Sequence, residues 1–316
     1  TRLRTVTGVQ TCALPILPAH RSMQVTNSPA VDRAIVRFPG YWSTVLRRFR
    51  RDPVAVGALV VILLLILMAI FAPWIAPQDP YKGMALRRLR PLGTDGYALG
   101  TDELGRDMLS RLIYGARLSL FMGVTPVFLA LLIGSLIGIT AGYVGGLVNT
   151  VLMRTIDIFF AFPSVLLAIA LSGAMGAGIA NGLISLTVVF IPPIARVAES
   201  VTTGVRNLDY VDAARASGAG SLSIIRHHVL GNVLGPIFVY AMSLIAVSMI
   251  LASGLSFLGL GVKPPEPEWG LMLNTLRTAI YVQPWIAALP GAMIFMVSIG
   301  FNLMSDGLRS AMDVRR

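Results

Sequence analysis

The stretch VAVGALVVILLLILMAIFAPWIA, residues 54–76, contains no charged residue and is long enough to cross a bilayer. A helix needs about 20 mostly apolar residues to span roughly 30 Å of hydrocarbon. Further segments of the same character predict an all-α integral membrane protein with six transmembrane helices. The expected spans are Val54–Ala76, Leu118–Ala141, Val151–Leu171, Gly182–Val201, Val233–Ser253 and Trp285–Ser305.

The composition of the chain agrees with this fold class. Hydrophobic residues make up 55% of the chain and charged residues only 13%, and the mean hydropathy is +0.75. Soluble domains carry about 25% charged residues. The net charge of +11 raises the possibility of nucleic-acid binding. We expect no nucleic acid as a partner, because the basic residues lie mostly beside apolar segments.

The arginines predict the orientation of the spans. Arg47, Arg48, Arg50 and Arg51 immediately precede the first span, and such clusters stay in the cytoplasm. Six crossings then place both termini and the loop 202–232 on the cytoplasmic side of the membrane. The basic residues of segment 77–117 conflict with its expected external position. We follow the even number of spans and the N-terminal arginines.

The chain divides into segments of different character. Residues 1–16, with the single cysteine Cys12, look like a translated sequencing adapter rather than evolved protein. The expected order is then an N-terminal cytoplasmic segment (17–52), the first transmembrane helix (53–76), an external connection (77–117), a membrane domain of five helices (118–308) and a cytoplasmic tail (309–316).

No residue pattern predicts chemistry within this chain. A GxxxxGK[ST] phosphate loop is absent from the sequence, so we expect no ATP binding, no enzymatic activity and no cofactor. The pair His227-His228 is either a polar patch or part of a metal site, and we expect the former because no further ligands accompany it. The segments 118–150, 158–195 and 229–262 contain no Asp, Glu, Lys, Arg or His. Proton- and ion-coupled transporters usually keep such groups within the membrane, so we expect a partner to supply the energy.

Small residues and prolines punctuate the spans. Gly134, Gly138 and Gly142 recur every four residues and predict close helix packing. Pro192-Pro193 is explained either by a bend beside a translocation path or by plain packing. The sequence LGTD occurs at residues 92–95 and again at 99–102, and both a simple duplication and a functional repeat explain it.

A short polar helix is predicted between the fourth and fifth spans, at YVDAARASG (210–218). Asp209 is the expected N-cap and Asp212 the acid of a capping box. Gly218 is suited to the left-handed conformation that ends many helices. The expected docking helix comprises Tyr210, Asp212, Ala213, Ala214, Arg215, Ala216 and Gly218, with the alanines forming a small-residue face; the alternative is an ordinary solvated connector.

This helix resembles the cytoplasmic coupling loop of bacterial ABC import permeases. Three more segments resemble the dipeptide, oligopeptide and nickel branch of that family, in particular its C-type membrane subunit. They are LGTDELGRDMLSRLIYGARLSL (99–120), LSFLGLGVKPPEPEWG (255–270) and NLMSDGLRSAMDVR (302–315). The second LGTD copy aligns with the family motif, and Asp212 stands where the family usually has glutamate.

The resemblance implies the type I ABC importer permease fold, a location in the bacterial inner membrane and a set of partners. These are a second, homologous permease subunit, ATP-binding cassette ATPase subunits seated on the coupling helix, and an external solute-binding protein. It implies import of di- or oligopeptides, with nickel, glutathione and opine-like solutes as alternatives. A secondary transporter and a channel are the competing functions, and the charge-free spans and the motif set argue against them.

Overall fold

The computed structural model describes residues 41–312. These residues form α-helices with short 3-10 and π-helical segments, and the described part of the chain contains no β-strand. The adapter-like segment 1–16 lies outside the described residues. The helices are α1 (Tyr41–Phe49), α2 (Pro53–Ile70), α3 (Ala72–Ile75), α4 (Met108–Val144), α5 (Gly146–Phe160), α6 (Ser164–Met175), α7 (Ile179–Arg206), α8 (Asp209–Ala216), α9 (Ser221–Ile224), α10 (Leu230–Phe257), α11 (Trp269–Thr275) and α12 (Pro284–Met312).

Five helical stretches are long and apolar enough to cross a membrane: α2, α4, the stretch from α9 through α10, α7 and α12. A sixth candidate is the pair α5 and α6, whose axes differ by 85°; the pair is either one broken span or a re-entrant loop. The predicted span Val151–Leu171 is thus interrupted between the end of α5 and the start of α6. Pro163 explains the break, because proline lacks the backbone N–H that would continue the helix and restrains the residue before it.

Helix α4 is much longer than the predicted second span. It has 37 residues, and at 1.5 Å per residue it extends for roughly 55 Å, well beyond the hydrocarbon layer. It begins at Met108 because the Asp107 carboxylate caps it, accepting a hydrogen bond from Ser110 N at 2.8 Å. Residues 108–117, which we expected in a connection, are thus helical, and the predicted span Leu118–Ala141 lies inside α4.

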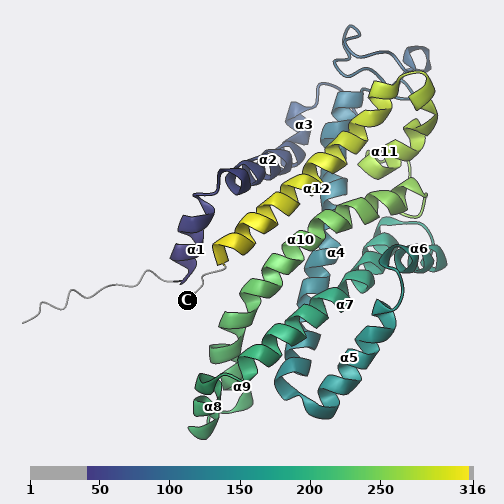
Figure 1. Cartoon of the computed structure of the whole chain (residues 1–316). Helices are drawn as coiled ribbons and strands as arrows, with labels where there is room; N and C mark the ends of the chain where they lie inside the picture. Colours follow the sequence, from purple (N-terminus) through teal and green to yellow (C-terminus); the bar gives the residue numbers. More distant parts are fainter. Residues whose placement is uncertain (1–40, 313–316) are drawn as a thin grey trace, which may run out of the picture. The chain divides into compact units, whose positions relative to one another are not determined.

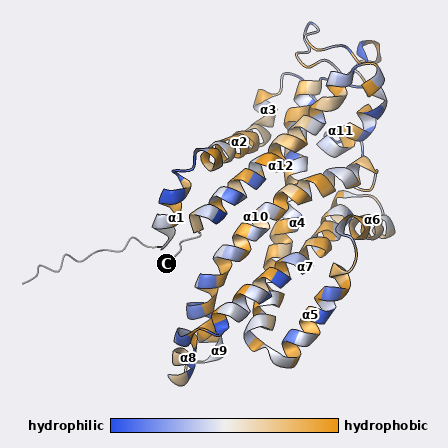
Figure 2. Cartoon of the chain, in the orientation of Figure 1, coloured by the Kyte–Doolittle hydropathy of each residue, from blue (hydrophilic) through white to orange (hydrophobic). Residues whose placement is uncertain are grey.

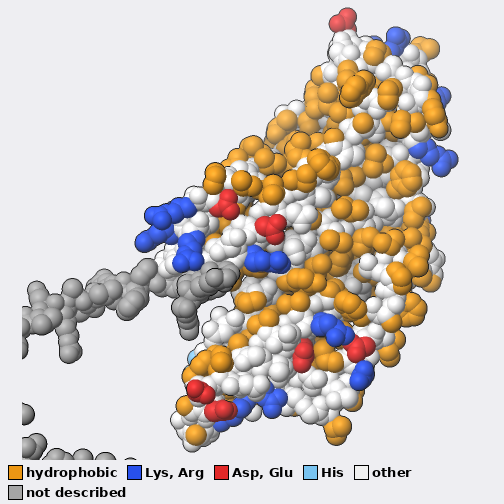
Figure 3. Space-filling model, viewed as in Figure 1, with side chains coloured by type: hydrophobic (Ala, Val, Ile, Leu, Met, Phe, Trp, Pro, Cys, Tyr) orange, Lys and Arg blue, Asp and Glu red, His pale blue; other side chains and the backbone are white. Residues whose placement is uncertain are grey.

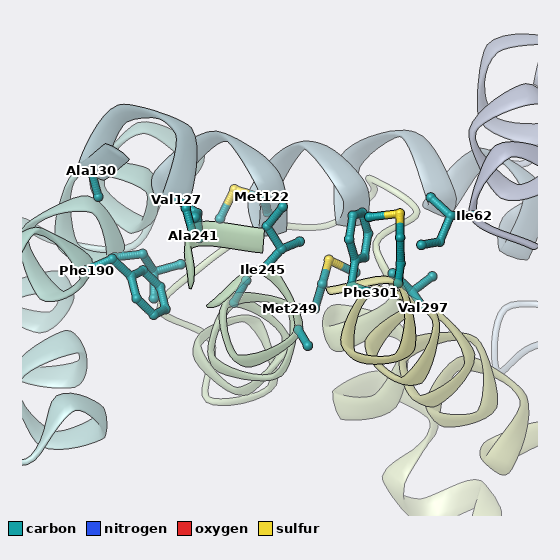
Figure 4. Packing of buried hydrophobic residues seen from close by; sticks show 14 of the residues in the cluster. Ile62, Met122, Val127, Ala130, Phe190, Ala241, Ile245, Met249, Val297 and Phe301 are labelled. Carbon is teal, nitrogen blue, oxygen red and sulfur yellow. The ribbon is translucent and has the colours of Figure 1, made fainter. Parts of the chain in front are cut away.

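One apolar core joins the long helices. Figure 2 shows hydrophobic residues along α2 and the middle of α10, and hydrophilic ones at α1 and α8. Figure 4 shows side chains from five helices meeting in this core. The labelled side chains are Ile62 from α2, Met122, Val127 and Ala130 from α4, Phe190 from α7, Ala241, Ile245 and Met249 from α10, and Val297 and Phe301 from α12.

A stripe of glycines brings α4 against α7, as the sequence predicts. A Cβ added at Gly134 would lie 3.0 Å from Ile191 O, and one at Gly142 would lie 2.7 Å from Glu199 O. Gly138, between them, would meet the Ala198 side chain at 2.6 Å. Because the backbones touch over two helical turns, α4 and α7 pack as one rigid pair.

The loops after α3 and after α10 lie at one end of the described bundle, which we call the loop end, and α8 and α9 lie at the other, the α8 end (Figure 1).

At the loop end, Asp102 is only 2% exposed. Its Oδ2 lies 2.6 Å from Arg106 Nε and 3.3 Å from Arg111 Nε. Its Oδ1 accepts hydrogen bonds from the backbone N–H groups of Leu104 and Arg106, each at 2.9 Å. The second LGTD copy is therefore a buried structural element, whereas Asp95 of the first copy is exposed.

The segment before α11 closes the loop end against the first turns of α4. Trp269 is fully buried and donates from Nε1 to Leu112 O at 3.0 Å. Glu268 caps α11 by accepting from the N–H groups of Gly270 and Leu271, both at 2.8 Å. Burial raises the pKa of the Glu268 carboxyl above its ordinary value, against the opposing effect of these hydrogen bonds. Ser119 Oγ donates a hydrogen bond to Glu268 and accepts one from Trp269 N–H. One polar network therefore joins residues that are about 150 positions apart in the sequence.

Candidate functional site

The predicted polar helix is present as α8, Asp209–Ala216, directly after the long helix α7. It lies at the tip of the α8 end in Figure 1 and carries exposed charged side chains. The chain continues through α9 and the π-helical segment Ile225–Val229 into α10. Any movement of α8 therefore acts on the ends of two candidate membrane spans.

The start of α8 differs from the prediction. Leu208, in an extended conformation, is the N-cap and makes no side-chain capping bond. Asp209 is the first residue of the helix, so the predicted Asp209 N-cap is wrong. Asp212 does not form a capping box; it accepts from Arg215 Nη1 at 2.8 Å. Both carboxylates still lie in the first turn, where the positive end of the helix dipole favours them.

The end of α8 is the glycine terminator that the sequence predicts. Gly218 has a φ of +82°. Its N–H donates to Arg215 O at 2.9 Å, and Ala219 N–H donates to Ala214 O at 3.1 Å. This pair of bonds is the Schellman arrangement, which needs a left-handed residue at the position of Gly218. The docking candidate is thus a short helix with a fixed end.

The three alanines of α8 do not share one surface. Ala214 packs against the core together with Val211, which is fully buried. Ala213 and Ala216 are exposed. Residues three apart lie on the same helix face, so Ala213 and Ala216 form the outward small-residue face while Ala214 anchors the helix.

Contacts that the sequence did not reveal fix α8 to neighbouring elements. The Tyr210 hydroxyl accepts from Asn232 Nδ2 at 3.0 Å, and the Tyr210 ring lies 6.1 Å from that of His228. The Arg215 guanidinium lies 5.8 Å from the ring centre of Tyr143, near the end of α4. These partners are 18 to 72 residues away in sequence, and no local pattern signals them.

The histidine pair lies in this same region. His227 Nδ1 is 3.0 Å from Ser223 O, and the His228 carbonyl accepts from Asn232 Nδ2 at 2.8 Å. Within residues 41–312, no three His, Cys, Asp or Glu side chains are grouped as they would be around a metal ion. The contacts of the pair serve the local structure between α9 and α10.

Two family models match the chain. Residues 134–315 match the binding-protein-dependent transport system inner membrane component, and residues 40–91 match the N-terminal transmembrane domain of oligopeptide transport permease C. The larger match covers more than half of the chain and includes α5 to α12.

Curated relatives match almost end to end. A glutathione transport system permease protein, GsiD, from Pectobacterium atrosepticum is 39% identical over 294 residues, covering 93% of this chain and 97% of that protein. A di/tripeptide transport system permease protein, DppC, from Pseudomonas aeruginosa is 40% identical over 292 residues, covering 91% and 96%. The chain therefore belongs to the family of binding-protein-dependent transport system inner membrane components, as a multi-pass permease subunit of the peptide branch.

Proposed function

We propose that this chain is one of two homologous permease subunits of an ATP-driven importer of short peptides, and that α8 docks an ATPase subunit. The observation that carries the docking proposal is the exposed face of Ala213 and Ala216 on a short helix with a fixed end. Small side chains let a partner approach closely, and the packing of Val211 and Ala214 against the core holds α8 in place when a partner presses on it. The solute classes named for the relatives, glutathione and di- or tripeptides, support peptide-like cargo.

The same proposal orients the molecule. ATP hydrolysis takes place in the cytoplasm, so an ATPase seated on α8 places the α8 end there and the loop end outside. Both termini then lie in the cytoplasm. The external solute-binding protein delivers its cargo to the loop end.

Transmission of force follows from the packing of α7. When closure of the ATPase pair moves α8, the movement enters α7 and α10 at their ends. Because the glycine stripe binds α4 tightly to α7, these two helices tilt together. The chain then transmits the movement of one ATPase subunit to its helices and forms half of the translocation path, and it catalyses no reaction itself.

The substitution Ala213→Trp tests this function. The indole would prevent the partner from seating, while the spans, which Ala213 does not contact, insert normally. We expect the ATPase to be lost on co-purification and substrate uptake to fall to the level of cells without the transporter. Pairing with the second permease is expected to persist.

The matched control is Leu86→Trp, a change at an 89% exposed position of the loop end. It is expected to leave retention of the ATPase on co-purification unchanged. Wild-type ATPase retention and uptake in Ala213→Trp would refute the docking role of α8.

A further inference from the structure

A groove with an apolar part and a charged part lies between α5 and α7. We call it the α5–α7 groove. The apolar part is a cavity of about 300 Å³ at the break between α5 and α6, lined by residues that include Phe159, Phe160, Phe162 and Phe190. The charged part is a cavity of about 310 Å³ whose lining includes Arg154, Asp157, Arg196 and Glu199.

The two cavities are neighbours along the same faces of both helices. Met153, Asp157 and Phe160 follow one another on α5 at spacings of four and three residues, as residues on one helix face do. On α7, Pro193, Arg196 and Glu199 are spaced by three. The Arg196 guanidinium lies 5.4 Å from the centre of the Phe160 ring and joins the two parts.

The charges of the groove are only partly satisfied within the chain. Asp157 is paired with Arg196. Arg154, with 80% of its side chain exposed, reaches Asp157 only at 3.7 Å. Glu199 accepts from Asn149 Nδ2 at 2.7 Å and Thr203 Oγ1 at 3.1 Å, and both bonds go to the same oxygen, Oε1. The groove thus offers one cation and one carboxylate oxygen to a ligand.

The position of these charges argues against a lipid-facing role. Asp157 lies three residues before the end of α5 and Arg196 ten residues before the end of α7, so each lies within a candidate span. Figure 3 shows acidic and basic side chains gathered over α5 and the adjoining part of α7, bordered by hydrophobic side chains. Charged side chains within a membrane span usually face a water-filled path or a protein partner rather than hydrocarbon.

We propose that the α5–α7 groove binds the transported solute in passage, and that the solute is a zwitterion with an apolar side chain. Arg154 attracts its carboxylate, Glu199 its ammonium group, and the phenylalanine-lined cavity its side chain. A short peptide has these three features. The combined volume is within the range of small-ligand sites, which begins at about 300 Å³. This inference rests on the proposed import function and names where this chain meets its cargo.

Protection of an introduced cysteine from alkylation tests the proposal. The sample is the purified permease–ATPase complex without the solute-binding protein, so that selection by that protein plays no part. In a Cys12→Ser background, Met153→Cys places a thiol in the charged cavity. The dipeptide Ala-Phe is expected to slow its reaction with a water-soluble maleimide at least about fivefold. The same peptide with both ends blocked is expected to give no protection, because its charges are absent.

Two further variants make the result decisive. Leu147→Cys, at an 83% exposed position of α5 outside the groove, is the control and is expected to react at the same rate with and without peptide. Arg154→Gln is expected to raise the half-protecting Ala-Phe concentration about tenfold, equivalent to about 1.4 kcal/mol. Arg154→Lys, which keeps the charge, is expected to restore part of the loss.

Several outcomes would overturn the inference. Equal protection by free and blocked peptide would show that the charges do not recognise the solute, and absence of protection would show that the groove is not occupied. Loss of the second permease from Arg154→Gln would identify the groove as a subunit interface instead. Retention of the ATPase by the same preparations separates these failures from failure of the import function, which would remove the ATPase from the wild type as well.

Discussion

The loop end and the α8 end of the described bundle differ in the burial of their charged side chains. At the loop end, Asp102, Arg106 and Arg111 are buried and pair with one another, and Glu268 bonds two backbone amides and Ser119. At the α8 end, Asp209, Asp212 and Arg215 are exposed, and so are Ala213 and Ala216. The loop end is satisfied by its own chain, whereas the α8 end presents a surface that a partner can complete.

Removing the central carboxylate of the loop end is expected to have the largest effect. Asp102→Ala leaves two buried guanidinium groups without their anion, which costs about 3–5 kcal/mol of stability. The measurement is thermal unfolding of the purified protein in detergent. Asp95→Ala, in the exposed first LGTD copy, is the matched control and is expected to change stability by less than about 0.5 kcal/mol. Equal losses in the two variants would mean that the repeated motifs have equivalent roles.

A smaller effect is expected from crowding the glycines of the two ends. A Cβ at Gly115, near the loop end, would lie 2.9 Å from Trp269 Cδ1, so Gly115→Ala is expected to destabilise the protein by about 1–3 kcal/mol. A Cβ at Gly231, near the α8 end, meets no atom within 4 Å. Gly231→Ala is therefore expected to be neutral, or to stabilise its helix by about 0.5–1 kcal/mol. The same unfolding measurement checks both; a tolerated Gly115→Ala would show that the loop end is loosely packed.

The smallest effect on global stability, but a clear local one, is expected at Gly218. A valine there must adopt a φ of +82°, which costs about 1–2 kcal/mol for an L-residue. This penalty loosens the end of α8, so backbone amides of α8 are expected to exchange hydrogen about tenfold faster while the unfolding midpoint stays unchanged. Substrate uptake is expected to fall with the loss of a rigid docking helix.

The matched control for this change is Gly220→Val, two residues away. Gly220 has a φ of −68°, which valine adopts without strain, and its Cβ position is open. Exchange in α8 is expected to match the wild type. If Gly220→Val and Gly218→Val accelerate exchange equally, the glycine terminator does not fix α8.

Local patterns predicted the elements that depend on local physics. The runs of apolar residues located the membrane helices, since length and composition alone set what can cross a bilayer. The spacing of Gly134, Gly138 and Gly142 predicted a close helix contact, and the structure shows that the partner is α7. The left-handed Gly218 followed from its place after a helical segment. The N-cap of α8 was misplaced by one residue, because Leu208 adopts the cap conformation without a capping side chain.

What the sequence by itself determined is thus the membrane class, the family and the existence of α8, all of which rest on composition, periodicity and short motifs. Only the tertiary structure decided which copy of LGTD is buried, which alanines of α8 face outward and which charges meet between α5 and α7. These properties depend on partners far apart in the chain, such as Arg196 with Asp157 and Trp269 with Leu112. No local pattern encodes such pairs, because burial and charge pairing arise only when the helices pack.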